Sequence, residues 1–233
     1  MKKATILTIF IFSNIFSTSA QGTYVSIDPF LPLFGTFQIH GEKAIHSKLS
    51  GMIGFGYKGS SGIFEINGIQ TETMDLNDID FEGYKIIPEV RWYWSKIDKG
   101  LTGFYTGAYY KFQKNSSEVT GVYTDKDGNA ISVDLDMRLT SNSGGIEIGY
   151  KLKAWKGLFF DFLFAGVGVT SHRAVFTENT VLPETFYQRF NEAADHYSVL
   201  KDLEPKLNLT REDLDTKFIL PNFRYGIKVG WAF

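Results

Sequence analysis

The chain has 233 residues, a formal net charge of −2 and no cysteine. The lack of cysteine excludes disulfides, thiolate metal sites and a cysteine nucleophile. The near-neutral charge, with no basic stripe, argues against nucleic acid as a partner. Aromatic residues make up 16% of the chain, and 23 residues are Gly. Only one region has the amphipathic helical pattern that soluble α/β enzymes of this length show several times, so the composition favours an all-β protein.

The first segment, residues 1–20, has the three-part pattern of a secretory signal peptide. Lys2 and Lys3 precede an apolar run from Ala4 to Phe16, and small or polar residues follow. This run is shorter than the roughly 20 residues that a spanning helix needs. We therefore expect residues 1–20 to be removed on export through the inner membrane, so that the mature chain begins near Gln21.

Residues 49–57, 81–95, 103–114, 131–139 and 158–164 alternate between apolar and polar or small residues, with a period of two that predicts β-strands. In residues 81–95, Tyr84 and Trp92 fall on one face, and Glu89 and Arg91 fall on the other. In residues 131–139, we expect the apolar residues outside and Asp134, Asp136 and Arg138 inside. Beyond residues 141–145 the apolar phase shifts by one position, which predicts a β-bulge at this Gly/Ser cluster.

The clearest alternation runs from Ile219 to Phe233. Arg224 and Lys228 share one face with glycines, as in a narrow polar interior, so the apolar face is expected to point outward. The apolar positions resemble the C-terminal sorting signal of outer-membrane β-barrels. That resemblance implies recognition by the barrel-assembly machinery and contact with outer-membrane lipid. The expected signal consists of Tyr225, Ile227, Val229, Trp231 and Phe233.

The connections alternate in length, as they do in transmembrane barrels. Short ones are expected at residues 45–48, 96–101 and 154–157, and long ones at 67–80, 115–130 and 173–217. The strands counted are 33–45, 48–66, 81–95, 101–114, 131–153, 157–172 and 217–233. Antiparallel closure needs an even number, which residues 24–30 can complete; ten strands is the alternative. The predicted fold is all-β, a closed antiparallel transmembrane β-barrel of eight strands over residues 21–233, in the bacterial outer membrane.

Three stretches resemble a family of small bacteroidete-type outer-membrane β-barrel proteins whose domain has no assigned function. They are Ile27–Phe37 followed by Glu42–Ile45, then Ile87–Tyr93, then Gly103–Gly107. The resemblance covers most of the mature chain and implies a fold and a location, not an activity. The segment before the last strand is longer than such a member would have, which leaves room for a chain-specific function.

Alternation also places charged and polar residues inside the barrel, with acids and bases nearly balanced. They could form an ion path or proton-titrating site, or a salt-bridge network that fills a narrow interior, because buried charges must be paired. We favour the network and expect Arg91, Arg224, Glu42 and Glu89 to meet in its periplasmic half. The interior set includes Gln38, His40, Tyr105, Tyr109 and Lys151. The expected charge network is Glu42, Glu89, Arg91, Lys111, Glu147, Asp161, Arg224 and Lys228.

Signals for catalysis, metals and cofactors are weak. Ser171 and His172 with Glu178 nearby suggest a triad, but adjacent residues in a strand point to opposite faces. The histidines His40, His46, His172 and His196 have no ligand spacing. Residues 125–129 contain part of a calcium-loop pattern and are better interpreted as a turn. We therefore expect no catalytic residue, no metal and no cofactor.

One region, within residues 173–217, predicts a helix. Phe186, Phe190, Ala193 and Tyr197 recur at helical spacing after Pro183. This helix is either a lid that contacts a ligand or an element packed over the barrel mouth. The expected function is a non-enzymatic outer-membrane protein, structural or binding an unidentified ligand through extracellular loops. The alternatives are a lipid-modifying or proteolytic barrel enzyme, or a narrow pore.

Overall fold

The structure is a computed structural model of the chain and describes residues 23–59, 69–77, 80–95, 100–197 and 209–233. The expected signal peptide, residues 1–20, and Gln21 lie outside this range. No helix in the described part is long and apolar enough to cross a membrane. The elements are β1 (Thr23–Ile27), η1 (Leu31–Phe34), β2 (Thr36–His46), β3 (Leu49–Lys58), β4 (Met74–Leu76), β5 (Glu82–Tyr93), β6 (Gly103–Thr124), β7 (Ala130–Trp155), β8 (Leu158–Glu178), α2 (Glu184–Tyr197) and β9 (Asp215–Ala232).

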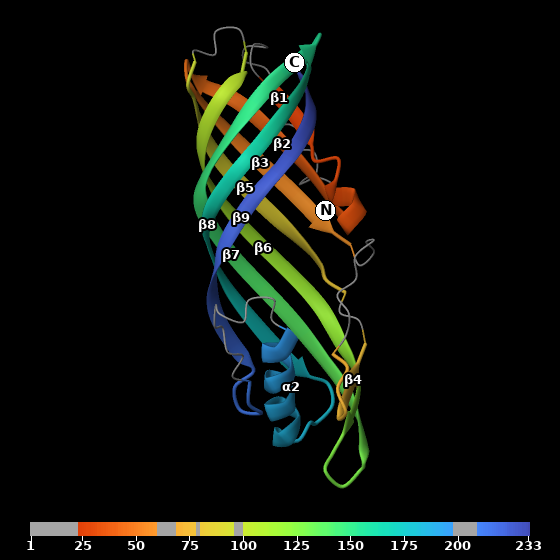
Figure 1. Ribbon diagram of the computed structural model, residues 1–233. Helices are drawn as coiled ribbons and strands as arrows, with labels where there is room; N and C mark the ends of the chain where they lie inside the picture. Colours follow the sequence, from red (N-terminus) through yellow and green to blue (C-terminus); the bar gives the residue numbers. More distant parts are fainter. Residues whose placement is uncertain (1–22, 60–68, 78–79, 96–99, 198–208) are drawn as a thin grey trace, which may run out of the picture.

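The strands form one antiparallel sheet that closes into a ring. Around the ring the order is β6, β5, β3, β2, β1, β9, β8 and β7, and β7 pairs again with β6. Val25 of β1 lies opposite Trp231 of β9, so the first and the last strand are paired with each other. The short β4 pairs with β6 near Gly121, so the described sheet has nine strands, and β4 was not predicted. Figure 1 shows the strands tilted around an elongated ring.

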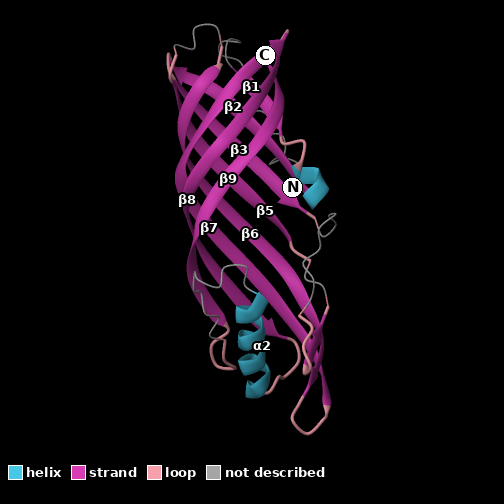
Figure 2. Ribbon diagram, in the orientation of Figure 1, coloured by secondary structure: helices cyan, strands magenta, loops and turns pink. Residues whose placement is uncertain are grey.

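The two ends of the ring differ, as the connection lengths predicted. At one end, the turn end, β2 joins β3 and β7 joins β8 through short turns. The other end, the hairpin end, carries α2, β4 and the tip of the β6–β7 hairpin (Figure 2). The short turn expected at residues 96–101 lies partly outside the described residues. Helix α2 falls in the region where the sequence predicted one.

Two of the long loops expected from the sequence are shorter than predicted, because the strands continue. Strands β6 and β7 pair without interruption as far as Thr124 and Ala130, so the loop expected at residues 115–130 is a hairpin with a tight turn. Strand β8 likewise runs on to Glu178, and β9 begins at Asp215. In these extensions of the strands the backbone hydrogen bonds continue, although the side chains no longer show the pattern of apolar residues on the outward face.

Strand β7 explains why that pattern was misleading. Odd-numbered residues face the interior throughout, from Val133 and Leu135 to Glu147 and Lys151, all of which are buried. The expected outward position of the apolar residues in 131–139 is therefore wrong, and Arg138 is exposed instead. The bulge expected at residues 141–145 is also wrong, because the β7 register there is continuous with both neighbours. The chemical polarity of the two faces inverts along the strand, while the geometry does not change.

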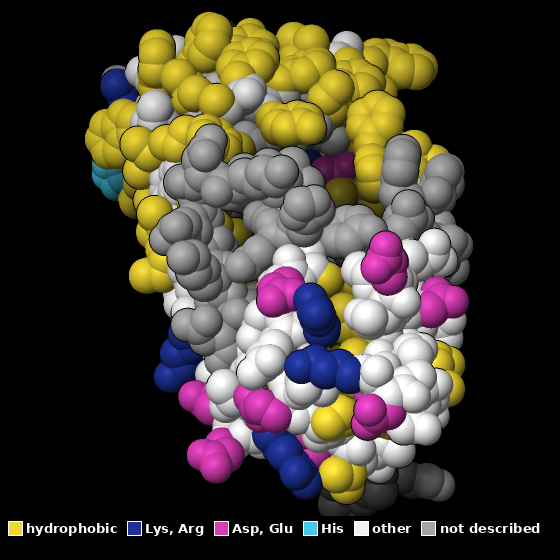
Figure 3. Space-filling view, turned by 60° about the horizontal axis from the view of Figure 1, so that its bottom comes forward, with side chains coloured by type: hydrophobic (Ala, Val, Ile, Leu, Met, Phe, Trp, Pro, Cys, Tyr) yellow, Lys and Arg dark blue, Asp and Glu magenta, His cyan; other side chains and the backbone are white. Residues whose placement is uncertain are grey.

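The outward face of the ring carries a continuous belt of exposed apolar side chains. Phe223 is 74% exposed, Phe37 68% and Ile146 65%. Figure 3 shows hydrophobic side chains gathered over one part of the surface, with charged side chains toward the hairpin end. The apolar belt, as defined here, comprises Phe37, Ile39, Ile53, Phe55, Tyr57, Val90, Trp92, Phe104, Tyr110, Ile146, Phe164, Val167, Val169, Phe223 and Tyr225.

The hairpin end has a hydrophobic core of its own, which we call the hairpin-end cluster. Helix α2 contributes Phe186, Tyr187, Phe190 and Ala193, whose spacing puts them on one helix face. Side chains from β4, β6, β7 and β8 complete it: Met74, Leu76, Val119, Tyr123, Val133, Leu135, Ala174 and Phe176, together with Ile69, Leu182 and Leu209. Here the strands turn their apolar residues inward against the helix, as in a soluble protein.

Candidate functional site: the charged interior

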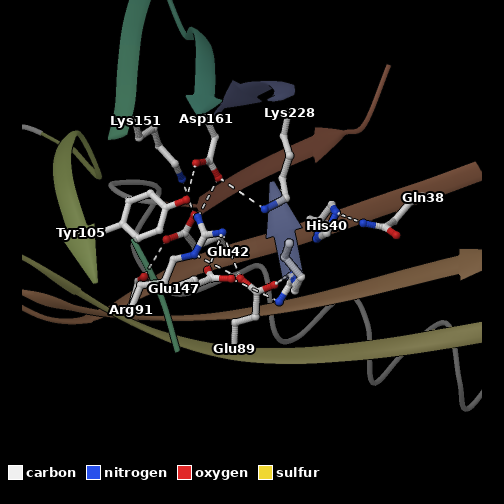
Figure 4. Close-up of polar contacts among 12 residues, drawn as sticks. Gln38, His40, Glu42, Glu89, Arg91, Tyr105, Glu147, Lys151, Asp161 and Lys228 are labelled. Atoms are coloured by element: carbon white, nitrogen blue, oxygen red, sulfur yellow. Dashed lines mark hydrogen bonds and ion pairs between the residues drawn. The ribbon is translucent and has the colours of Figure 1, made fainter. Parts of the chain in front are cut away.

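The interior of the ring toward the turn end is filled by four carboxylates and four cations, which we call the charge network. They come from five strands, β2, β5, β7, β8 and β9, and Figure 4 shows side chains of the network converging from different sides. Seven of the eight side chains are at most 4% exposed, and that of Arg224 is 13% exposed. With all groups ionised the network has no formal net charge. Its members are Glu42, Glu89, Arg91, Glu147, Lys151, Asp161, Arg224 and Lys228.

Arg91 of β5 is the centre of the charge network and is fully buried. Its guanidinium lies 2.7 Å from Asp161, 3.0 Å from Glu89, 3.4 Å from Glu42 and 3.5 Å from Glu147. A guanidinium has five N–H donors in a planar fork, so it can bind several carboxylates at once. Arg91 therefore links strands that are not neighbours in the sheet.

The remaining three cations lie around this centre. Lys151 of β7 donates to Glu42, and Lys228 of β9 lies 3.8 Å from Asp161. Arg224 lies 2.7 Å from Glu89 and 3.1 Å from Glu147. Each carboxylate therefore has at least two cationic partners, which is what the desolvation of buried charges requires.

Hydroxyl groups and aromatic rings complete the packing around the charges. Tyr93 and Ser50 donate to Glu42 over 2.9 and 2.6 Å, and Tyr105 donates to Asp161 over 2.7 Å. Cations also stack on rings: Arg91 lies 4.3 Å from the ring centre of Tyr105, and Arg224 lies 4.1 Å from that of Tyr109. Such cation–π contacts are worth up to about 2 kcal/mol where the groups are desolvated.

Toward the turn end the charge network is covered by an aromatic layer. Tyr24, Tyr93, Tyr105 and Phe159 form a second hydrophobic cluster together with Leu101. The Leu101 amide donates to the Tyr24 hydroxyl over 2.7 Å, which ties the β5–β6 connection to β1. The Lys151 ammonium lies 4.6 Å from the ring centre of Tyr24 and 4.7 Å from that of Phe159. Water reaches few of these side chains, because most are under 2% exposed.

The four residues expected to meet, Arg91, Arg224, Glu42 and Glu89, do lie in one network. Lys111 was expected in it as well, but it is half-buried nearer the hairpin end and has no ion pair in the described part of the chain. Lys151 belongs to the network, although the expected network did not include it. Of the expected sorting signal, Tyr225, Trp231 and Phe233 are exposed, and Ile227 and Val229 are half-buried.

Sequence reasoning missed a contact between Ser141 and His172. The Ser141 hydroxyl lies 2.8 Å from Nδ1 of His172, because the two residues are opposite each other in the β7–β8 register. The His172 ring also stacks on Phe218, at 4.9 Å between centroids. Only the strand register could have revealed this pair. No carboxylate among the described residues is hydrogen-bonded to the imidazole, so the orienting group of a triad is not present there.

The remaining candidates for chemistry are located as follows. His196 lies where side chains are outside the described part, and His40 is buried with a nitrogen 2.6 Å from the Gln38 amide nitrogen. Asp125 accepts backbone hydrogen bonds from Asp127 and Asn129, which closes the β6–β7 turn. Among the described residues no group of three or more His, Cys, Asp or Glu could hold a metal ion.

Comparisons with known proteins give no assignment: no family model matches the chain, and neither a curated protein nor a solved structure does.

Proposed function

We propose that this chain is a bacterial outer-membrane β-barrel protein without enzymatic activity, structural or binding a ligand at its hairpin end. In this proposal the ring is a closed barrel of eight strands that crosses the membrane, and β4 is an accessory strand outside it. Residues 1–20 direct export and are removed. The partners are outer-membrane lipid and, during biogenesis, the barrel-assembly machinery.

The observation that carries the proposal is the inverted polarity of the ring. The apolar belt faces outward, while the charge network and its hydroxyl partners face inward. Monomeric soluble proteins rarely expose contiguous apolar patches of more than a few hundred Å². A ring leaves no sheet edge unpaired, which hydrocarbon requires because it offers backbone groups no partner. The turn end then faces the periplasm, and the hairpin end faces outward, as long loops do in such barrels.

This proposal is tested by the behaviour of the mature protein in membranes. We expect it to fractionate with the outer membrane, to need detergent for extraction and to migrate differently on gels with and without boiling. Recovery of folded protein in the soluble fraction without detergent would overturn the proposal.

The rival function of a narrow pore is opposed by the same interior. The charge network and the aromatic layer of Tyr24, Tyr105 and Phe159 fill the ring toward the turn end. We therefore expect no steady conductance when the purified protein is inserted into planar bilayers. Large, reproducible single-channel steps would favour the pore.

A second candidate, an enzyme acting on membrane lipid, is favoured by the hydrogen bond between Ser141 and His172. A serine beside a histidine base is the minimum of a nucleophilic site. Overexpression should change the lipid profile of the membrane if the pair is catalytic, and Ser141→Ala should abolish the change. On our proposal the lipid profile is the same in cells that overexpress wild type, in cells that overexpress Ser141→Ala and in cells that overexpress neither.

A further inference from the structure

The interior of the ring is divided by charge into two parts. The charge network toward the turn end is balanced, with four acids and four bases. Toward the hairpin end the interior carries three lysines, Lys58, Lys85 and Lys111, which we call the lysine layer. Among the described residues, Asp28 is the acid that faces the lysine layer, and its carboxylate attracts Lys85. This part of the interior is therefore positively charged.

Lys85 and Lys111 are neighbours in this layer. Lys85 of β5 pairs with Gln113 of β6, and Lys111 is on the same face of β6, one position nearer the turn end. Such diagonal neighbours lie roughly 7–8 Å apart between Cα atoms. A Cβ added at Gly56 would come within 2.6 Å of the Lys85 Cε, so the absent side chain of Gly56 leaves room for the lysine to lie across the interior.

Neither ammonium group has a direct ion-pair partner within the described part of the chain, although Asp28 attracts Lys85. Both side chains are half-buried, and neither has a hydrogen bond or ion pair there. The Lys58 ammonium donates to the Phe34 carbonyl, and one Asp28 oxygen accepts from the backbone amides of Phe30 and Leu31. Arg224, already paired with Glu89 and Glu147, adds a further positive charge that repels both lysines. Partly desolvated like charges at this spacing destabilise the fold unless an anion lies between them.

Neutral polar side chains lie on the inner face of the strands next to the two lysines. Gln113 and Asn115 of β6 provide amide groups, and the Gln113 amide lies 3.4 Å from the Asn115 oxygen. On β7 and β8, the Thr170 hydroxyl donates to Ser143 over 2.8 Å, and Ser141 contacts His172. In the register, Lys111 pairs with Ser143, and Gln113 with Ser141. Strands β6, β7 and β8 thus place hydroxyl and amide groups, which can donate to an oxyanion, on the inner face beside Lys111.

From this arrangement we infer that the lysine layer is a binding site for a phosphate group, held between the ammonium groups of Lys85 and Lys111. A phosphate carries about −1.5 to −2 charges near pH 7, which matches two unpaired lysines, whereas a carboxylate would neutralise one. Lysine binds phosphate as a point charge, and the guanidinium fork, which suits carboxylate and phosphate alike, is already occupied by carboxylates at Arg91. The group can belong to a soluble phosphate or to a lipid headgroup.

This inference deepens the proposed function by giving the barrel a class of ligand. The test uses the full mature protein folded in detergent micelles, titrated with inorganic phosphate and separately with micelles that contain a lipid with a phosphate monoester headgroup or a neutral lipid. The variants are Lys85→Gln, Lys111→Gln and the double variant. The control is Lys153→Gln, which removes an exposed lysine at the turn end of β7, far from the lysine layer along the strand.

We expect wild type and Lys153→Gln to bind phosphate, and the double variant to bind roughly tenfold or more weakly, because two charge-assisted contacts are lost. Phosphate should raise the melting temperature of wild type and leave that of the double variant unchanged. Without phosphate, the double variant should be at least as stable as wild type, since it lacks the repulsion. Binding of only the free ion or only the lipid identifies the source.

The inference is overturned if neither form of phosphate binds, if the double variant binds as tightly as wild type, or if Lys153→Gln loses as much affinity. Failure here is distinguishable from failure of the proposed function. A protein that inserts into membranes and ignores phosphate refutes the site alone, whereas a protein recovered folded without detergent refutes the barrel.

Discussion

Among single residues, Arg91 contributes most to holding the interior together. Among the described residues it is the largest fully buried side chain, and it contacts carboxylates from β2, β5, β7 and β8. Lysine could not replace it, because an ammonium is a compact point charge with three donors, while the guanidinium spreads five donors across a plane. The other cations each meet one or two carboxylates. Arg91 is therefore the position where the loss of one charge leaves the most partners unpaired.

We predict that Arg91→Ala lowers the free energy of unfolding by roughly 3–5 kcal/mol, the usual cost of leaving a buried charge unpaired. Glu42→Ala should cost less, because Arg91 keeps three other carboxylates. The double variant should lose less than the sum of the two, since each change removes part of the other's unpaired charge. Urea unfolding in lipid vesicles measures all three.

The matched control for this series is Arg173→Ala. Arg173 pairs with Asp215 at 2.5 Å, but its side chain is 55% exposed, so solvent screens the pair and its loss should change stability little. If Arg91→Ala has an unfolding midpoint as close to wild type as Arg173→Ala, the charge network does not stabilise the ring. The residues of the charge network could then line a water-filled path through the interior.

At the scale of the element, β7 shows that one strand crosses two environments. The same row of inward positions is apolar at Val133 and Leu135, where it packs against α2, and charged at Glu147 and Lys151. The outward row changes in the opposite sense, from Ser132 and Arg138 to Ile146. The point where both rows change marks where the belt ends, and on our proposal it is the outer surface of the hydrocarbon.

We predict that Ile146→Lys lowers the free energy of unfolding in bilayers by about 2–4 kcal/mol, the cost of a charge on the lipid face of a barrel near the midplane. Ser132→Lys lies on the same strand and the same outward face, beyond the belt, and should change stability by no more than about 0.5 kcal/mol. Equal effects at the two positions would contradict a membrane boundary between them.

Helix α2 gives a pH-dependent prediction outside the belt. Burial and a hydrogen bond to Glu178 raise the pKa of Tyr187 above its ordinary value of 10.0. Because the folded state holds the phenolic proton more tightly than the unfolded state, this stabilisation is complete below about pH 10 and is lost as the pH rises through the raised pKa. The protease resistance of the hairpin end should fall over that alkaline range in wild type. Tyr187→Phe, which has no proton to lose, should show a smaller alkaline decline; an identical decline in both would refute the assignment.

At the scale of the whole molecule, the sequence predicted the all-β class, the two unequal ends and most strand positions. Alternation carries that information wherever one face meets an apolar medium and the other a polar one, as in β3, β5 and β9. It failed in the part of β7 that precedes Thr140, where the polarity of the two faces is inverted although the strand is continuous. It also could not predict β4, which is three residues long, or pairs such as Ser141 and His172, which depend on the register between strands.

The charge network was accessible to sequence reasoning for a related reason. Strand alternation placed Glu89, Arg91, Asp161 and Lys228 on the inner face, and electroneutrality in a narrow interior implied that they pair. Alternation does not tell where a residue lies along the axis of the ring, because that position depends on strand tilt and register. Lys111 was therefore grouped with the charge network, although it lies beside Lys85 in the lysine layer.

The molecule thus has two packing units of opposite polarity on shared strands: the part of the ring around the charge network and the hairpin-end cluster around α2. We predict that they can be destabilised separately. Phe186→Ala removes a fully buried ring from the hairpin-end cluster, a change that typically costs 3–5 kcal/mol. Limited proteolysis should then cleave the hairpin end readily, while migration of the unboiled protein on gels stays that of the folded barrel. Gln188→Ala, an exposed position on the same helix, is the control and should behave like wild type. If Phe186→Ala abolishes the folded band, the ring depends on α2 for closure, and the helix is part of the barrel's core.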